Sequence, residues 1–357
     1  MKKDVYRLAA VIAATLLIGY VWLSSPAPYV VQKPGHAADV GPMVAARNPD
    51  VREGSVIMLT TVRQQYPNWA TYIAARFHPE WDVYRQHDIF QEGETQSEYV
   101  ARQRYVMKNS HSNAMQAAYR ALDIPYEILP AGVIVTGTVA GMPAEKVLRA
   151  GDRIVEVDGR PVSAGDELAE YVRGMEAGKT VRIAFERGGE RQDAEVEIGD
   201  FGNLPAEPSA PPRSGPGLGV LMMTLLEVKA LDPERQVEIS VDEIGGPSAG
   251  LIFALEVVDQ LTPGDLTRGY RIAGTGTIDA EGRVGPVGGV RHKVVAAAQE
   301  QADLFFVPKA NEEEARTKAE QIGAGMTVVA VGTLQDALEV LERLPAKTPE
   351  LTRNQPA

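Results

Sequence analysis

Apolar and polar positions change their spacing several times along the chain, and each change marks an expected element. Apolar residues run almost unbroken over 8–23, which predicts a hydrophobic helix, and a buried strand is expected over 54–62. A helical pattern follows over 99–122. Later strand and helix patterns alternate over 218–228, 237–241, 249–261, 304–307, 311–322, 326–331 and 334–344. Such alternation favours a mixed α/β or α+β core.

A strand-rich unit with tight turns is expected over 128–200, between the early and late patterns. Ile154, Val155 and Val157 form a strand that ends in Asp158-Gly159, a hairpin signal. Five prolines follow in the stretch 201–217, which we interpret as an extended linker. The polar residues 346–357 are expected to form a disordered tail.

Composition narrows the class of protein. The chain has 357 residues, enough for two domains, and a formal net charge of −12 that argues against nucleic acid as a partner. It contains no cysteine, which excludes a disulfide framework and thiol chemistry. The histidines His78, His87 and His111 lack metal-ligand spacing, so we expect neither a metal nor another cofactor.

The N-terminal apolar stretch has two interpretations. Its 16 residues would span about 24 Å as a helix, somewhat less than the ~30 Å hydrocarbon core. Tyr20 and Trp22 suit an interfacial belt, and the preceding lysines suit a cytoplasmic start. A signal peptide cleaved after Ser25-Pro26-Ala27 is the alternative, although Pro28 would then follow the cut. We favour an uncleaved anchor over 8–25, with 1–7 cytoplasmic and everything after it exported.

Ser248 lies in the segment Gly245-Gly246-Pro247-Ser248-Ala249-Gly250, just before a long apolar run. Pro247 suits the first position of a helix, and free N–H groups at that end could hold an oxyanion. Leu251, Ile252, Leu255 and Val258 are predicted to form the buried stripe of this helix. A serine that merely caps a helix is the plainer alternative.

Lys293 gives the serine a chemical partner. Val290, Ala296 and Ala297 stand three or four residues away, so the lysine falls on an apolar helical stripe. Snorkelling would explain this position without any function. Burial would instead lower the lysine pKa from ~10.4 towards 7, and a neutral lysine can act as the base for a serine nucleophile. We therefore interpret Ser248 and Lys293 as a dyad.

Two rival motifs fail on their context. Gly246-Pro247-Ser248-Ala249-Gly250 also satisfies G-x-S-x-G, but an α/β-hydrolase needs a later acid and histidine. His292 is the only histidine downstream, and beside Lys293 in a helix it would point away from the lysine's face. Gly174 to Thr180 is similar to a P-loop, yet it has three residues between its glycines where four are needed.

Residues 237–330 resemble the proteolytic domain of the Lon family, which uses a Ser–Lys dyad. Ser248 falls on that family's GPSAG serine and Lys293 on its GG-x-x-x-K lysine. Thr275 matches the threonine whose hydroxyl contacts the lysine, which implies that Ser248, Lys293 and Thr275 are the catalytic residues. Many Lon enzymes carry an acid three residues before the serine, where this chain has Gly245. Any role of that acid is absent or has moved to Asp242 or Glu243.

The segment around Met142-Pro143-Ala144 and Gly151-Asp152 is typical of bacterial PDZ domains, which bind extended peptides along a sheet edge. We place its peptide-carboxylate loop near Pro130-Ala131-Gly132-Val133, although a GLGF-type sequence is not seen there. The whole arrangement resembles the membrane-anchored PDZ–Lon proteases of Gram-positive bacteria, the YlbL and SepM type. The resemblance implies that the PDZ domain is inserted and that the strand over 56–62 completes the later core.

The sequence thus predicts an α+β protein with a Lon-type domain, an inserted PDZ domain and a transmembrane helix. The expected parts are 1–7, the anchor 8–25, the early protease segment 26–127, the PDZ domain 128–200, the linker 201–217, the proteolytic domain 218–345 and the tail 346–357.

The expected function is ATP-independent cleavage of exported peptides or proteins by a single-pass protein of the cell membrane, with the PDZ domain recruiting substrate. A non-catalytic PDZ adaptor at the cell surface is the alternative. Lon-type domains often form rings, which leaves a homo-oligomer open.

Overall fold

The computed structural model describes residues 2–47, 56–91, 94–204, 214–241 and 244–347. Most of the expected linker 201–217 and of the expected tail 346–357 lies outside these ranges. Asp242 and Glu243, to which the role of the missing acid could have moved, also lie outside them.

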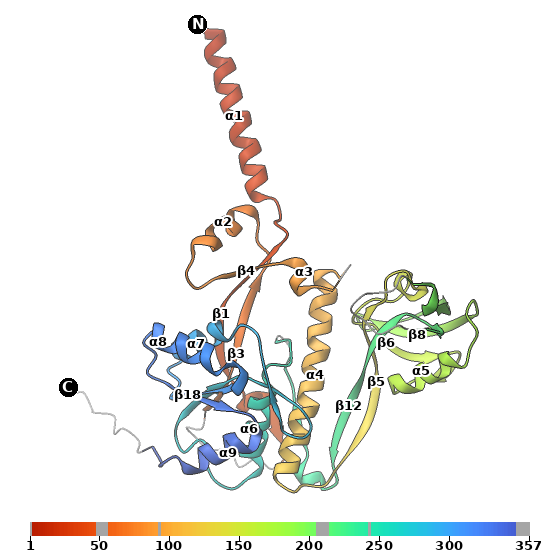
Figure 1. The fold of residues 1–357 in the computed structure, drawn as a ribbon, viewed down its shortest axis with the longest axis vertical. Coiled ribbons are helices and arrows are strands. Elements are labelled where there is room, and N and C mark those ends of the chain that lie inside the picture. Colours follow the sequence, from red (N-terminus) through yellow and green to blue (C-terminus); the bar gives the residue numbers. More distant parts are fainter. Residues whose placement is uncertain (1, 48–55, 92–93, 205–213, 242–243, 348–357) are drawn as a thin grey trace, which may run out of the picture.

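The first helix, α1 (Lys2–Ser24), projects away from the rest of the chain (Figure 1). By length and composition, its segment Tyr6–Ser24 could cross a membrane. The chain enters the folded part directly after α1, because Ala27 N donates a hydrogen bond to Pro67 O at 2.9 Å. Beside this junction lies the short helix α2 (Trp69–Phe77).

A six-stranded sheet forms the proteolytic part, in the order β18-β17-β14-β3-β1-β4. Its strands are β1 (Tyr29–Asp39), β3 (Val56–Gln65), β4 (Asp82–Arg85), β14 (Arg271–Gly274), β17 (Leu304–Pro308) and β18 (Thr327–Val331). β14 pairs in parallel with β17 and with β3. The early strand therefore completes the later core, as the family resemblance implies.

Helices cover this sheet and bury its apolar residues. They are α4 (Gln96–Ala121), α6 (Gly250–Leu261), α7 (Val290–Gln299), α8 (Glu312–Gln321) and α9 (Leu334–Arg343). One apolar cluster joins α4, α6 and α9, and a second lies under α7 and α8. Smaller pieces are η1 (Gly41–Met43), β2 (Val44–Ala46), α3 (Gln86–Ile89), η4 (Pro233–Arg235), β13 (Val237–Ile239), β15 (Thr277–Ile278), β16 (Val284–Gly285) and η5 (Lys309–Asn311).

A second sheet, with its own apolar core, forms the PDZ part in the order β12-β5-β6-β8-β9, with β7 beside β6. The elements of the PDZ part are β5 (Tyr126–Thr138), η2 (Pro143–Lys146), β6 (Arg153–Val157), β7 (Arg160–Pro161), α5 (Gly165–Arg173), β8 (Thr180–Arg187), β9 (Glu190–Glu197), β10 (Gly199–Asp200), η3 (Phe201–Asn203), β11 (Pro216–Gly217) and β12 (Val220–Ala230). The long pair β5 and β12 runs from this sheet to the lower end of α4 (Figure 1).

β12 belongs to the PDZ sheet, whereas residues from 218 onward were expected to open the proteolytic domain. It pairs with β5 over eleven positions, from Val220 opposite Thr138 to Ala230 opposite Tyr126. The apolar run of β12 predicts a strand but carries no mark of its partner, and only the pairing assigns it to this sheet.

Candidate active site

The loop before α6 presents Ser248. α6 begins at Gly250 with Ala249 as its N-cap, so Pro247 lies in the preceding turn and not at the first helical position as predicted. Gly246 adopts a φ of +91°, a conformation that glycine accepts without strain. The face of α6 that carries Glu256, Asp259 and Gln260 is buried along with the predicted apolar stripe. Ser248 therefore lies two residues before a helix whose polar and apolar faces are both buried.

Hydrogen bonds from two directions fix this loop. On the α4 side, Gly246 N donates to Gln103 O at 2.9 Å and Ser110 Oγ donates to Pro247 O at 3.1 Å. On the sheet side, Ser248 O accepts bonds from Gly276 N at 2.8 Å and from Thr275 Oγ1 at 2.9 Å. The backbone around the serine is thus held independently of any substrate.

Lys293 reaches the site from α7, whose N-cap Gly289 has a left-handed φ of 68°. Val290, Ala296 and Ala297 are fully buried around the helix, and Lys293 itself is only 3% exposed. Burial penalises the charged amine and lowers the Lys293 pKa to about 7. A large fraction of this lysine is therefore neutral at physiological pH.

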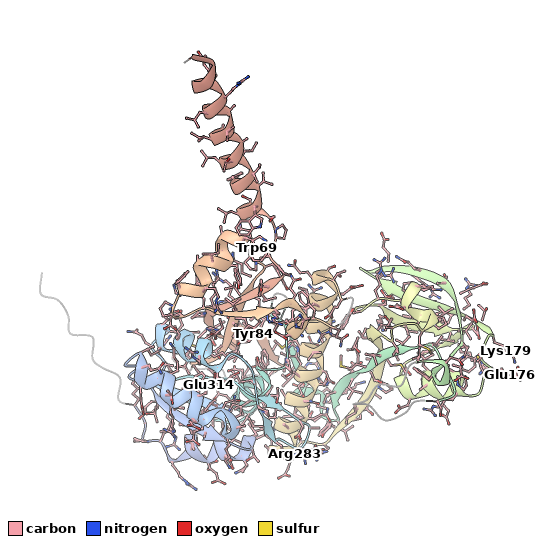
Figure 2. The ribbon with its side chains drawn as sticks, turned by 45° about the horizontal axis from the view of Figure 1, so that its top comes forward. Trp69, Tyr84, Glu176, Lys179, Arg283 and Glu314 are labelled. Carbon is pink, nitrogen blue, oxygen red and sulfur yellow. The ribbon has the colours of Figure 1, made fainter. Side chains whose placement is uncertain are left out.

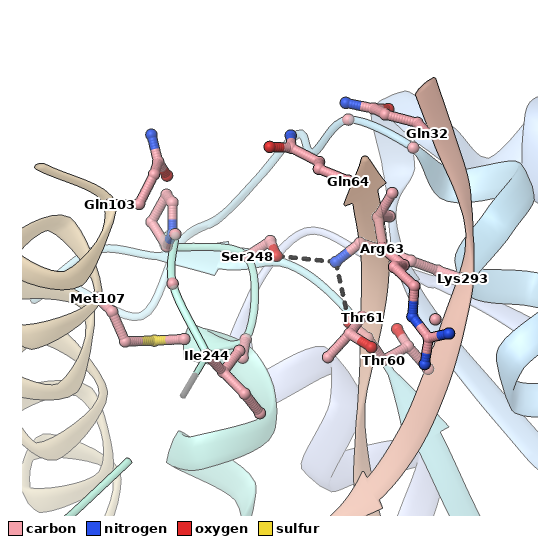
Figure 3. Close-up of a pocket in the computed structure, with 18 of the residues that line it drawn as sticks. Gln32, Thr60, Thr61, Arg63, Gln64, Gln103, Met107, Ile244, Ser248 and Lys293 are labelled. Carbon is pink, nitrogen blue, oxygen red and sulfur yellow. Dashed lines mark hydrogen bonds between the residues drawn. The ribbon is translucent and has the colours of Figure 1, made fainter. Parts of the chain in front are cut away.

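Three oxygen atoms surround the Lys293 Nζ: Ser248 Oγ at 2.8 Å, Thr275 Oγ1 at 2.9 Å and Thr60 O at 3.1 Å. Figure 3 shows the serine and the lysine facing each other. Thr60 O can only accept, and Thr275 Oγ1 already gives its proton to Ser248 O. A neutral amine therefore spends both N–H groups on these two oxygens, and its lone pair is left to accept the proton of Ser248 Oγ.

The side chains of the three predicted residues, Ser248, Lys293 and Thr275, are thus in contact. Ser248 is half-buried at the edge of a cleft, and Thr275 is fully buried. Thr60, from β3, is a contact that the sequence did not reveal. Its contribution is a backbone carbonyl, which no residue type identifies. Only the pairing of β3 with β14 places that carbonyl beside the lysine.

A cleft of about 840 Å³ opens in front of Ser248 and Lys293. Its walls are β1, β3 and α4, which contribute polar side chains such as Gln32, Gln64 and Gln103 (Figure 3). Met107 and Ile244 add an apolar patch beside the serine loop. This volume is within the range of roughly 300–1,000 Å³ found for ligand pockets and is large enough for a short peptide segment.

Gly245 stands at the position where many Lon enzymes carry an acid. A Cβ on this glycine would lie 3.0 Å from Gln103 Cβ, a contact that requires α4 or the loop to shift. The close approach of α4 therefore explains why a side chain is poorly accommodated here.

The remaining sequence candidates lie elsewhere. His292 points away from the dyad, with its Nε2 3.0 Å from Asp82 Oδ2 on β4. His78 stacks on Trp81, and His111 is buried against Phe253, where burial lowers its pKa to about 4. The P-loop-like segment is a turn between α5 and β8, in which Lys179 pairs with Glu176. Among the described residues, no group of His, Asp and Glu side chains has metal-binding geometry.

The prediction that the PDZ carboxylate loop lies near Pro130–Val133 is wrong. Val133 lies in β5 and pairs with Thr224 of β12 on one side and with Ile154 of β6 on the other. The interior of a sheet leaves no free edge there for a peptide strand.

A better placed turn, Gly217-Leu218-Gly219-Val220, directly precedes the edge strand β12. Leu218 O accepts from Ala144 N at 3.3 Å and Gly219 O accepts from Val139 N at 2.8 Å. The C=O and N–H of one peptide unit point in opposite directions, so the N–H groups of Gly219 and Val220 point away from these donors. The Gly-x-Gly signal is visible in the sequence, but it lies after the linker, at the other end of the module.

Comparisons with known proteins also distinguish two parts, although the PDZ match includes most of α4 and does not reach β12. Residues 104–198 match the PDZ domain family, and residues 241–343 match the Lon protease (S16) C-terminal proteolytic domain. Lon protease 2 of Herpetosiphon aurantiacus is 34% identical over 108 residues, which are 29% of this chain and 13% of that protein. Lon protease 1 of Bacillus subtilis is 33% identical over 94 residues, 26% of this chain and 12% of that protein.

Among solved structures, the PDZ domain of an SdrC-like protein from Listeria monocytogenes is 28% identical and covers 26% of this chain and 86% of that chain, with a TM-score of 0.21. The two family matches show that the chain combines a PDZ domain with a Lon-type proteolytic domain. It spans only about an eighth of the Lon proteases named above, which are 13% and 12% covered.

Proposed function

We propose that this protein is a membrane-anchored, ATP-independent serine endopeptidase that cleaves exported peptides or proteins with a Ser248–Lys293 dyad. The observation that supports it most is that the hydrogen-bonding positions of Lys293 Nζ are satisfied in both of its protonation states. In the neutral state the lone pair of Nζ faces Ser248 Oγ, and in the charged state all three N–H groups have an acceptor. The site thus satisfies the lysine both before and after it takes a proton.

The proposed reaction follows from this geometry. Ser248 Oγ attacks the scissile carbonyl carbon while its proton passes to Lys293 Nζ. The tetrahedral intermediate then expels the peptide amine, which receives that proton, and an ester remains on Ser248. Water hydrolyses the ester by the reverse proton transfers. Thr275 positions the lysine, because its hydroxyl links Nζ to the Ser248 carbonyl.

Backbone amides are the proposed oxyanion donors. Pro247 O is directed towards Ser110 and Ser248 O towards Gly276, so the N–H groups of Ser248 and Ala249 point the opposite way. Both residues line the cleft. Fixed donors of this kind stabilise the developing charge without reorganisation during the reaction.

The PDZ part is proposed to recruit substrate along β12. This strand is at the edge of its sheet. The helix α5 begins beside it, because Gly165 N at the start of α5 donates a hydrogen bond to Thr224 Oγ1 of β12 at 2.9 Å. A peptide added along the edge would place its terminal carboxylate at the N–H groups of Gly219 and Val220. Such tethering raises the local substrate concentration without altering the chemistry.

The proposed anchor is α1. Its candidate span of 19 residues is about 28 Å long as a helix, close to the thickness of the hydrocarbon core. The side chains described along it are exposed and make few contacts with the folded part (Figure 2). The cleft would then lie on the extracytoplasmic side.

The decisive experiment incubates the detergent-solubilised full-length protein with an unfolded model substrate in the absence of ATP. We expect cleavage by the wild type and by the Ser240→Ala variant, whose serine is exposed and outside the cleft. Ser248→Ala is expected to be inactive while keeping the melting temperature of the wild type. Peptide binding by the wild type without any cleavage would favour the adaptor and contradict the proposal.

A further inference from the structure

The outer face of α2 is apolar. Ala70, Ile73, Ala74 and Phe77 follow one another at helical spacing, and all four are exposed. Ile73 is 42% exposed and Phe77 is 84% exposed. The inner face, with buried Ala75 and half-buried Tyr72, packs towards β1 and β4.

Single exposed apolar residues are ordinary on protein surfaces, but a continuous helical stripe indicates a partner. We call Ala70, Ile73, Ala74 and Phe77 the α2 stripe. The one charged residue within α2 is Arg76, and the helix contains no acidic residue. Helices that lie in a lipid interface combine an apolar face with basic residues, and Arg76 supplies one such residue beside the α2 stripe.

The position of α2 decides which partner it has. Trp69 N donates a hydrogen bond to Ser25 O at 3.2 Å, so the first residue of α2 is bonded to the residue that follows α1. The Trp22 ring stacks on the Trp69 ring with centroids 5.5 Å apart. Figure 2 shows Trp69 at the base of α1.

Aromatic side chains continue from this junction into the folded part. Tyr29 stacks on Tyr72 with centroids 4.3 Å apart, and Trp69 lies edge-on to Tyr72 at 5.5 Å. Tryptophan and tyrosine are enriched where protein meets lipid headgroups. The headgroup layer is roughly 5–8 Å deep on each side of a bilayer, so α2 begins at its level if α1 spans the membrane.

We propose that α2 is a second membrane contact, lying in the headgroup region of the outer leaflet with the α2 stripe towards the acyl chains. This inference rests on the proposed role of α1 as an anchor. α1 alone, as a single span, would leave the protein free to tilt relative to the membrane. A second contact fixes its orientation.

The fixed orientation sets the height of the cleft above the membrane. Gln32, which lines the cleft, lies eight residues after the end of α1, at most about 26 Å of extended strand. The preferred substrates are therefore segments of exported proteins that lie within this distance of the membrane surface.

The absence of cysteine permits a direct test by single-cysteine spin labelling of the full-length protein. The protein is reconstituted in vesicles of phosphatidylcholine and phosphatidylglycerol. Labels are placed at Ala74→Cys in the α2 stripe, at Leu17→Cys within α1 and at Gln335→Cys on the exposed surface of α9. Accessibility to oxygen, which concentrates in lipid, is compared with accessibility to a water-soluble nickel complex.

We expect the label at position 74 to resemble the label at position 17, with several-fold lower nickel accessibility than at position 335. Adding Ile73→Asp and Phe77→Asp should return position 74 to the values of position 335. Both side chains are exposed, so the fold should persist, and thermal melting checks it.

A label at position 74 that matches position 335, while position 17 lies in lipid, overturns the α2 contact and leaves the anchor intact. A water-exposed label at position 17 overturns the anchor and the α2 contact with it. Shielding of position 74 from both reagents, with dipolar broadening between labels, would identify a second copy as the partner and also overturn the proposal.

Discussion

The proteolytic part and the PDZ part of this chain place polar groups in opposite ways. Of the fourteen buried polar or charged side chains among the described residues, Asp152 alone belongs to the PDZ part, where Arg187 pairs with it at 2.7 Å. The others lie in the proteolytic part and include Lys293, Thr275 and Thr60. The proteolytic part buries polar side chains, whereas the PDZ part presents backbone N–H groups at the edge of its sheet.

This difference has an energetic consequence. A buried amine costs folding free energy, and in the proposed mechanism the same desolvation makes the lysine a base at neutral pH. The edge of the PDZ sheet bears no such cost, because its N–H groups remain available to water until a peptide replaces that water. The predictions below test each side of this contrast.

The largest effect is expected from the dyad. Ser248→Ala, Lys293→Ala and Lys293→Arg should each lower kcat/KM by roughly 10⁴-fold or more, because serine and base act as one unit and arginine cannot supply a neutral base. Initial rates with a short fluorogenic peptide measure this loss. Near wild-type turnover by folded Lys293→Ala would remove the lysine from the mechanism.

Lys293 should also make stability depend on pH. Burial holds its pKa at about 7 in the folded chain, against 10.5 when unfolded, so between these values the unfolded chain binds the extra proton. Stability from this group is therefore lowest below pH 7 and rises towards pH 10.5. We expect Lys293→Met to reduce the gain between pH 6 and pH 9.5 by roughly 3 kcal/mol.

Urea unfolding of both proteins at the two pH values measures this difference. Equal pH dependence in wild type and Lys293→Met would mean that the amine is solvated in the folded state.

A smaller effect is expected at the edge of the PDZ sheet. Peptides with a free C-terminus should bind roughly 10- to 100-fold more tightly than the same peptides with a C-terminal amide, since bonds to a charged group contribute about 1.5–3 kcal/mol. Calorimetric titration of the full-length Ser248→Ala variant measures both affinities without cleavage. Identical affinities would show that Gly219 and Val220 do not hold a carboxylate.

The smallest effect concerns Ser110, which positions the serine loop from α4. The Ser110→Ala variant loses the hydrogen bond to Pro247 O. Its kcat should fall about five-fold with KM unchanged, because one such bond contributes roughly 1 kcal/mol. Ser112→Ala is the matched control, because its hydroxyl donates to Leu226 O of β12 at 2.6 Å and does not touch the loop. The idea fails if both variants lose the same activity on a short peptide.

The same contrast explains what the sequence could predict. Apolar spacing predicted α4, α8, α9 and the strands β3, β17 and β18, and a lysine on an apolar stripe pointed to the site. The Thr60 carbonyl could not be predicted, since Thr60 lies 233 residues from Lys293 in the chain and only the pairing of β3 with β14 brings the two together. The carboxylate loop was misplaced because its Gly-x-Gly signal lies at the far end of the module, where the Pro-rich stretch separates it from the rest of the PDZ sequence.

The most direct test of the account is the pH dependence of Ser248 phosphonylation by an active-site phosphonate ester, measured as a second-order rate constant. The rate should rise about tenfold per pH unit below 7 and level off above it, because Lys293 must be neutral to accept the serine proton. Lys293→Ala should lack this step. A wild-type rate that keeps rising to pH 10 would mean an ordinary lysine pKa and would contradict a buried neutral base.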